Sequence, residues 1–531
     1  MEPQTPSKTK LSIMGLLQSH RILKICLIFT AIVLVSAGSF YGYSKMREGK
    51  PYFTVVVDCG STGTRVNVYE WRLTGGGNGD LPSLLHSYPD DPAKSHLRNS
   101  GCHYHCMQTE PGLDKFVGNS SGVSASLEPL IRWAEGLVPQ DRHVDTPVFV
   151  LATAGLRRLP QEDAKRLLED VENVIKKHSF MWRRSWIRVL NGREEAHYGW
   201  IALNYKMRRL NSPSRLPTLG LLDLGGSSLQ IAMEASDTRK DNHLLPSRIG
   251  SKEHQLMAYS LPSFGLNKAF DRTVSMLTQV NSVGNETGSE VRHPCLSSRF
   301  VGNHSCGSCS TPYSLLHLVG DPNWERCKIV AKAAAMNTSF RDWSEPSVDS
   351  SCRRNSPTDG KNVLNIHIST SRGVQYHALS GFFAVYNMLN LTTKANLTNI
   401  WGKARDLCSA TWDDPENAFG SQYCFKVLYL ATLLEDGLCL GEADIIFGPG
   451  DISWTLGASL VEAEHAWRRS STVITAPEYM EIISSPILLF IILTVLLFVV
   501  YHCQIKLPKP RKRSVVRESL PSYNYPKHRP H

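Results

Sequence analysis

The sequence lacks an excess of charge over most of its length. Its formal net charge is +10, but residues 1–24 carry +3 and residues 501–531 carry +7, so residues 25–500 are formally neutral. A protein that binds nucleic acid is expected to present a basic surface on its folded part. The charge pattern therefore predicts no nucleic-acid partner.

Charged residues are missing altogether from two apolar runs, 25–44 and 482–505. Each is long enough to cross a bilayer as a helix, and we predict transmembrane helices at 25–44 and 482–502. The first run exceeds the hydrophobic core of a usual signal peptide, which favours an uncleaved anchor over a cleaved signal. The basic residues of 503–531 predict a cytoplasmic tail, and two spans then place 1–24 in the cytoplasm as well. Everything between the spans is expected in a lumen or outside the cell.

Cysteine is scarce, at 13 in 531 residues, which excludes a small disulfide-stabilised scaffold. Ten cysteines besides Cys59 lie between the predicted spans, an even number that suits an oxidising compartment. Cys306 and Cys309 form a CxxC with no second pair at zinc-ribbon spacing, so we interpret them as disulfide partners and not metal ligands. Connectivity stays open, and the candidate pairs include Cys295–Cys327 and Cys408–Cys424.

Sequons for N-glycosylation occur only between the predicted spans, which agrees with a lumenal or extracellular location. The candidate sites are Asn119, Asn285, Asn303, Asn337, Asn390 and Asn396.

A repeat organises the middle of the chain. Residues 55–71 read VVVDCGSTGTRVNVYEW, and residues 220–234 read GLLDLGGSSLQIAME. Both have an apolar strand, Asp-x-Gly, a Gly/Ser/Thr series and an alternating second strand, which predicts a hairpin. A single Asp-x-Gly turn between strands is usually structural, but two copies with the same pattern indicate a functional loop. Glycines and hydroxyls can surround a phosphate, and the Asp can hold a divalent cation directly or through water.

Two further segments lie between the copies. PVFVLATAGLRRLP (147–160) predicts a buried strand that ends at Thr153 and is followed by a helix. IRVLNGREEAHYGWIALNY (187–205) predicts a strand, a turn at Asn191–Gly192, and a helix that carries Glu194 and Glu195. Taken alone, two glutamates at a helix start are more often partners of the helix dipole than catalysts.

These four segments, in this order, resemble the apyrase family, the ecto-nucleoside triphosphate diphosphohydrolases. The resemblance covers about 55–458 and is greatest to plant-type members, in a doubly anchored layout. It implies an α/β fold with two actin/hexokinase/Hsp70-like lobes, each related to RNase H. Lobe I would comprise 51–192 plus 450–478, and lobe II would comprise 193–449.

The resemblance also implies hydrolysis of terminal phosphates of nucleoside tri- or diphosphates, with Ca²⁺ or Mg²⁺ as cofactor. Glu195 would be the general base, Ser228 and Gln230 would orient the water, and Thr153 would contribute from the other side of the cleft. Asp58 and Asp223 would hold the metal through its waters. The residues implied in phosphate binding are Ser61, Thr62, Gly63, Thr64, Gly225, Gly226 and Ser227.

The sequence departs from the family at the nucleobase site. Family members often hold the base between two aromatic side chains, and the matching positions here are Ala384 and Leu438. The base preference therefore stays open. Cys59 stands where the family usually has a small residue, and we interpret it as a packing variant.

Two other interpretations remain beside the hydrolase. A nucleotide-binding receptor or scaffold would not need Glu195, Ser228 and Gln230. A kinase or chaperone ATPase of the same fold is disfavoured by the predicted topology. The sequence leaves open a Golgi, secretory or plasma-membrane location and is compatible with a homo-oligomer.

Overall fold

The computed structural model describes part of the chain, in segments that include both halves of the repeat. These residues are 51–73, 81–89, 107–210, 216–235, 243–282, 290–305, 315–338, 374–394, 396–409 and 421–471, with Trp343, Cys352, Leu364, Ile366, Leu493 and Thr494. The chain divides into two units, Gly49–Val473 and the terminal segments Met1–Glu48 with Ile474–His531. The predicted spans 25–44 and 482–502 lie outside the described residues, apart from Leu493 and Thr494. No helix in the described segments is long and apolar enough to cross a membrane.

The first half of the unit Gly49–Val473 contains a six-stranded sheet in the order β3-β2-β1-β5-β6, with β4 beside β2. Its hairpin β1–β2 is antiparallel, as the repeat predicts, and β1, β5 and β6 are parallel. The strands are β1 (Tyr52–Cys59), β2 (Thr64–Arg72), β3 (Ser83–Tyr88), β4 (Gln108–Thr109), β5 (Val148–Ala152) and β6 (Ile187–Val189).

Successive side chains of β1 point into two different cores, because both faces of the first sheet are covered. Val55 and Val57 point to an outer core shared with α2 (Ser120–Leu137) and α4 (Gln161–Ile175). Val56 points the other way, into an inner core. The run of valines is thus buried on both sides, as expected for strands with parallel neighbours.

The second half contains another six-stranded sheet, in the order β15-β14-β7-β8-β10-β9. The second hairpin of the repeat, β7–β8, is again antiparallel, and β14 runs parallel to β7. The strands are β7 (Gly220–Leu224), β8 (Ser228–Glu234), β9 (Leu244–Ile249), β10 (Lys252–Pro262), β14 (Gln375–Ser380) and β15 (Asp444–Phe447).

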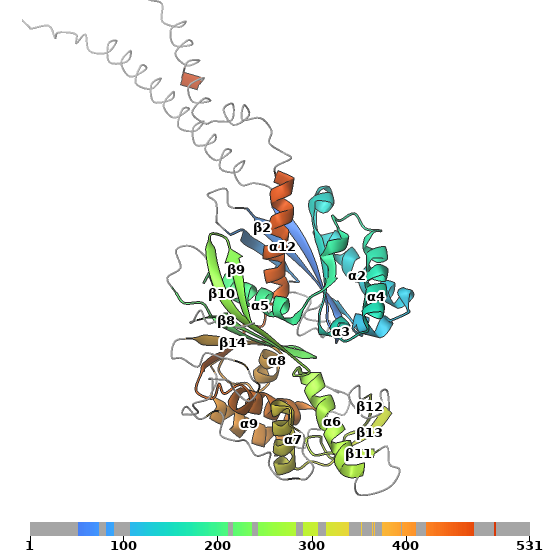
Figure 1. Cartoon of the computed structure of the whole chain (residues 1–531), viewed down its shortest axis with the longest axis vertical. Coiled ribbons are helices and arrows are strands. Elements are labelled where there is room, and N and C mark those ends of the chain that lie inside the picture. Colours follow the sequence, from blue (N-terminus) through green and yellow to red (C-terminus); the bar gives the residue numbers. More distant parts are fainter. Residues whose placement is uncertain are drawn as a thin grey trace, which may run out of the picture. The chain divides into compact units, whose positions relative to one another are not determined.

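Helices cover the outer face of the second sheet and form the largest core with it. Figure 1 shows α6, α7 and α9 on this side. The helices are α6 (Leu266–Ser282), α7 (Trp324–Met336), α8 (Gly381–Asn387), α9 (Leu397–Ser409) and α11 (Tyr423–Thr432). A small sheet of β11 (Glu290–His293), β12 (Val301–Ser305) and β13 (Leu315–Gly320) adjoins them. Short helical turns lie at Leu113–Phe116, Gln140–Asp145, Arg184–Trp186 and Leu433–Gly437.

The inner core lies between the two sheets and is filled by α5 (Gly192–Lys206) and α12 (Trp454–Ser471). The two helices pack closely, since a Cβ at Gly457 would lie 2.0 Å from the carbonyl oxygen of Tyr198. Although α12 comes last, it bonds to the first sheet: Tyr69 Oη and Thr455 Oγ1 are 2.7 Å apart, and Trp71 donates to Ser459 over 3.1 Å. Figure 1 shows α12 beside β2.

Among the residues that the structure describes, three disulfides stabilise the second half of the chain. The two candidate pairs, Cys295–Cys327 and Cys408–Cys424, are both bonded, and so is Cys352–Cys439. Cys59 is a buried free thiol in β1, which agrees with its interpretation as a packing residue. Cys306 and Cys309 lie outside the described residues.

Candidate functional site

A cavity of about 350 Å³ opens where the two hairpins of the repeat face each other. Both hairpin loops line it, together with the start of α5 and the segment before α12. The sequence-predicted residues that line it are Asp58, Ser61, Thr62, Thr153, Glu195, Asp223, Gly225, Gly226, Ser227, Ser228 and Gln230. The fold thus gathers most of the predicted site from four separate segments of the chain.

The two loops approach each other closely at Gly226. A Cβ there would lie 2.8 Å from Thr62 Cγ2 and 3.3 Å from Asn267 Nδ2, so only glycine fits without a shift. Behind it, Gly265 leaves room for the second loop, because a Cβ at that residue would lie 2.3 Å from the backbone nitrogen of Ser227. The glycines therefore bring backbone N–H groups close to the cavity, as a phosphate site requires.

The two aspartates of the repeat sit at equivalent places, near the ends of β1 and β7. Burial raises the pKa of Asp58 to about 6, against the opposing effect of Arg65, and the charge of Asp223 raises it further. Burial also raises the pKa of Asp223, while a hydrogen bond from Ser380 lowers it. Asp58 Oδ1 is buried without a hydrogen-bond partner. Two buried carboxylates, one of which raises the pKa of the other, are a good setting for a cation.

Glu195 lies in the first turn of α5 with its carboxylate at the cavity. Asn191 caps this helix, and its side chain and that of Glu194 form a capping box. Glu194 therefore stabilises the start of the helix, which is the usual role of a glutamate in the first turn. Glu195 instead is 8% exposed, and burial raises its pKa to about 7. Arg157 opposes that shift, and the charges of Asp223 and Asp58 add to it. Its pKa is therefore close to neutral, where a general base works well.

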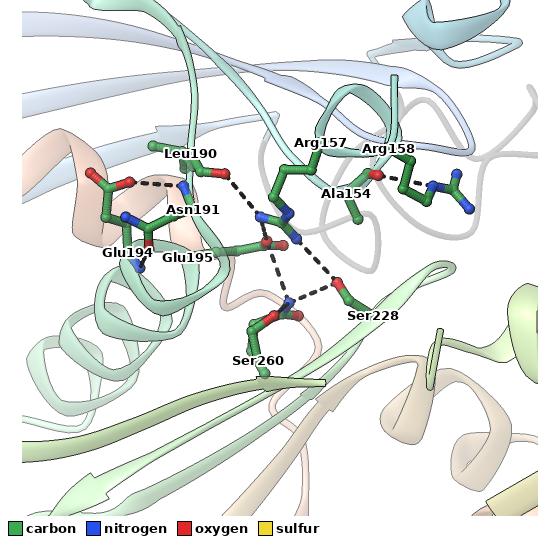
Figure 2. A network of polar contacts seen from close by, with 10 residues as sticks. Ala154, Arg157, Arg158, Leu190, Asn191, Glu194, Glu195, Ser228 and Ser260 are labelled. Carbon is green, nitrogen blue, oxygen red and sulfur yellow. Dashed lines mark hydrogen bonds and ion pairs between the residues drawn. The ribbon is translucent and has the colours of Figure 1, made fainter. Parts of the chain in front are cut away.

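A polar network joins Glu195 to the second hairpin, and Figure 2 shows it. The side-chain amide of Gln230 donates to Ser228 Oγ over 2.7 Å and approaches Glu195 Oε2 at 3.4 Å. The same nitrogen lies 3.2 Å from Ser260 Oγ on β10. Ser228 and Gln230 are neighbours on one face of β8, because side chains two residues apart in a strand point the same way. The spacing Ser-x-Gln thus places both groups beside the carboxylate.

Two predicted phosphate ligands are not brought to the cavity. Gly63 packs against the backbone of Thr109, and Thr64 begins β2 with a fully buried side chain. They belong to the hairpin, but they do not line the cavity with Ser61 and Thr62. At the expected base site, Ala384 lines the cavity, whereas Leu438 is buried in the outer core of the second sheet.

The structure also brings residues to the site that the sequence did not single out. Asn267 at the start of α6 and Trp454 at the start of α12 line the cavity, as does Ser380. Ser380 has φ 53° and ψ −117°, a strained conformation for a serine, and this places its hydroxyl at Asp223. Arg157 contacts Glu195 from behind. The sequence shows Arg157 four residues after Thr153, but it does not predict the contact between Arg157 and Glu195.

Comparisons with known proteins bear on the family of the chain. A profile of the GDA1/CD39 (nucleoside phosphatase) family matches residues 44–474. The chain is 37% identical over 464 residues to "Probable apyrase 7" of Arabidopsis thaliana, which covers 84% of this chain and 61% of that relative. It is 24% identical to "Ectonucleoside triphosphate diphosphohydrolase 1" of Bos taurus, with 83% of this chain and 86% of that one covered.

Among solved structures, the chain resembles the nucleoside triphosphate hydrolases from Neospora caninum, with a TM-score of 0.54 and 16% identity. The match covers 83% of this chain and 98% of the other. At that identity, the likeness concerns the fold.

Proposed function

The chain belongs to the GDA1/CD39 family of nucleoside phosphatases, and from this premise we propose that it hydrolyses the terminal phosphate of nucleoside tri- and diphosphates. The names of its relatives, apyrase and ectonucleoside triphosphate diphosphohydrolase, support this substrate class. One observation of the chain itself carries the proposal: a buried carboxylate, Glu195, faces a cavity formed by two glycine-rich loops.

In the proposed reaction, Glu195 takes a proton from water while the water oxygen forms a bond to the terminal phosphorus. The bond to the bridging oxygen breaks, which releases inorganic phosphate and a nucleotide one phosphate shorter. Ser228 and Gln230, already joined by a hydrogen bond of 2.7 Å, would orient the water beside the carboxylate. Thr153 would meet the phosphate from the first sheet. Backbone N–H groups of the loops would stabilise the charge of the transition state.

The residues present fit a hydrated divalent cation. The described segments contain no group of three or more His, Cys, Asp or Glu side chains arranged as direct ligands. Asp58 and Asp223 nevertheless form a buried acidic pair, and Asp58 Oδ1 lacks a hydrogen-bond partner that water on a metal would supply. Mg²⁺ in particular retains several waters and needs few carboxylates. When bound, Mg²⁺ or Ca²⁺ would neutralise phosphate charge; we propose Asp58 and Asp223 as its anchors.

We also propose that the hydrolase faces a lumen or the cell exterior and is anchored by the two apolar runs. The three disulfides of the described residues and the exposure of Asn119, Asn303, Asn337, Asn390 and Asn396 support an oxidising, glycosylating compartment. The sixth sequon, Asn285, lies outside the described residues.

The test is phosphate release by the full-length protein from a panel of nucleoside di- and triphosphates, with Mg²⁺, Ca²⁺ or a chelator. We expect metal-dependent release that Glu195→Ala abolishes without loss of folding. The neighbouring Glu194→Ala variant is the matched control and should retain activity. A folded wild-type protein that binds nucleotide without releasing phosphate would instead be a receptor or scaffold.

A further inference from the structure

Arg157 has an unusual position at the back of the site. It ends the short helix α3 (Ala154–Arg157), which follows β5 of the first sheet. Its guanidinium reaches groups that pack on the second sheet: Nη1 donates to Glu195 Oε2 over 2.8 Å, and Nη2 lies 3.3 Å from Ser228 Oγ. Figure 2 shows Arg157 between these two side chains. A single side chain thus bridges the general base and a water-orienting hydroxyl.

The guanidinium is itself fixed to the first half of the molecule. Nη1 also donates to the carbonyl oxygen of Leu190 over 3.1 Å, just after β6. The Arg157 side chain is 20% exposed, and the Glu195 side chain is 10% exposed. Among the described residues of this helix, Ala154 lines the cavity and Arg157 does not. Arg157 therefore meets the base and the serine from outside the space that a substrate would occupy.

We propose that Arg157 is a positioning residue that fixes the distance between Glu195 and Ser228 and makes it depend on how the two sheets are placed. This inference rests on the proposed hydrolysis. It implies that Glu195 and Ser228 are aligned to activate water only while Arg157, at the end of α3, contacts both. The rigid, planar fork of arginine suits this task, because two donors reach two acceptors at once. Lysine has one mobile ammonium group and cannot keep both contacts.

The charge of Arg157 has a second effect on the base. Asp58 on β1 and Asp223 on β7 face Glu195 and raise its pKa, whereas Arg157 lowers it. The strands β8 and β10 present only the uncharged Ser228, Gln230 and Ser260 to this network. Loss of Arg157 should therefore move the acidic limb of the kcat profile to higher pH, because more alkaline conditions are needed to ionise Glu195.

Arg158 provides a matched control. It is the same residue type one position later, but its Nε donates to the carbonyl of Ala154 and its side chain points away from Glu195 in Figure 2. In full-length protein we expect Arg157→Ala to lower kcat about 10- to 100-fold, the range typical of outer-shell residues that orient metal ligands, with KM little changed. Arg158→Ala should stay within about twofold of wild type, as surface substitutions usually do.

Added guanidinium ion should partly restore kcat in Arg157→Ala and have no such effect on Arg158→Ala. Arg157→Lys should have a kcat between those of wild type and Arg157→Ala. If the alanine variant does not fold, the kcat of Arg157→Lys tests the proposal instead. Equal kcat and equal pH limbs in Arg157→Ala and Arg158→Ala, or an Arg157→Lys variant indistinguishable from wild type, would overturn the proposal. If Glu195→Ala itself remained active, the proposed hydrolysis would fail first, and the two failures are distinct.

Discussion

The two hairpins of the repeat share their shape but differ in the residue that faces the aspartate. In the first hairpin Asp58 is paired across the strands with Arg65, and in the second Asp223 is paired with Gln230. The Arg65 guanidinium lies 3.5 Å from Asp58, so the first carboxylate has a cation beside it. Gln230 instead points its amide to Ser228 and Glu195. The first hairpin thus places a cation beside its aspartate, and the second places a side-chain amide beside Glu195.

Gln230→Ala is expected to have the largest effect among the variants that test this difference. If the second hairpin orients the attacking water, its loss should lower kcat about 10²- to 10³-fold, as removal of one aimed donor does in other enzymes. Steady-state kinetics with a nucleoside triphosphate measures this. Asn67→Ala in β2 is the comparison, since Asn67 also lines the cavity but lies on the first hairpin. Equal losses in both variants would remove the functional distinction between the hairpins.

Asp58→Asn and Asp223→Asn ask whether the two aspartates act together. If both anchor one cation, each variant should need about 10- to 100-fold more Mg²⁺ or Ca²⁺ for half-maximal activity. Metal titration at saturating nucleotide gives the value. A shift in one variant alone would assign the metal to a single hairpin.

Glu195→Gln tests the environment that the second hairpin helps to create. The pKa of Glu195 is raised to about 7 from 4.5, so the folded protein binds a proton that the unfolded chain releases. Stability from this group is complete below about pH 4.5 and is lost as pH rises through 7. At pH 8 the variant should be more stable than wild type by about 3 kcal/mol, and the gain should vanish near pH 4.5.

Denaturant unfolding at the two pH values measures this effect. Glu194→Gln is the control, because Glu194 belongs to the capping box of the same helix turn. That variant should show no gain in stability at pH 8. A gain at pH 8 in Glu194→Gln as large as that in Glu195→Gln would mean that burial of Glu195 is not the cause.

The smallest expected effect belongs to Arg65→Gln, which gives the first hairpin the cross-strand pair of the second. Removal of a cation beside the phosphate loop should raise KM for nucleotide a few-fold and leave kcat almost unchanged. The variant should also raise the pKa of Asp58, since Arg65 lowers it now. A fall in kcat as large as that in Gln230→Ala would show that both hairpins handle the water.

Much of this site was visible in the sequence, because repetition marks it. The two copies of Asp-x-Gly predict the hairpins β1–β2 and β7–β8, and the strand–turn–helix pattern predicts α5 with Glu195 in its first turn. Gly63 and Thr64 belong to the same pattern, but at these residues the chain has already left the cavity and begun β2. The repeat predicts that a loop lines the cavity, but it does not predict which residue of the loop is the last to do so.

Arg157 and Ser380 could not be found in this way. Arg157 meets Glu195 across 38 residues of chain, and Ser380 meets Asp223 from another strand. Such contacts depend on how the sheets pack, which local patterns do not specify. The strained φ of Ser380 is likewise imposed by its surroundings and leaves no mark in the sequence.

The return of α12 to the first sheet has a consequence for biosynthesis. Tyr69 and Trp71 leave the ribosome early, but Thr455 and Ser459, their hydrogen-bond partners, follow 386 and 388 residues later. At ~5–20 residues per second, the inner face of the first sheet waits roughly 20–80 s for the helix that covers it. During that time an apolar surface made by Val56, Tyr69 and Trp71 is open to other chains. The nascent protein should therefore depend on chaperones until its last helix has emerged.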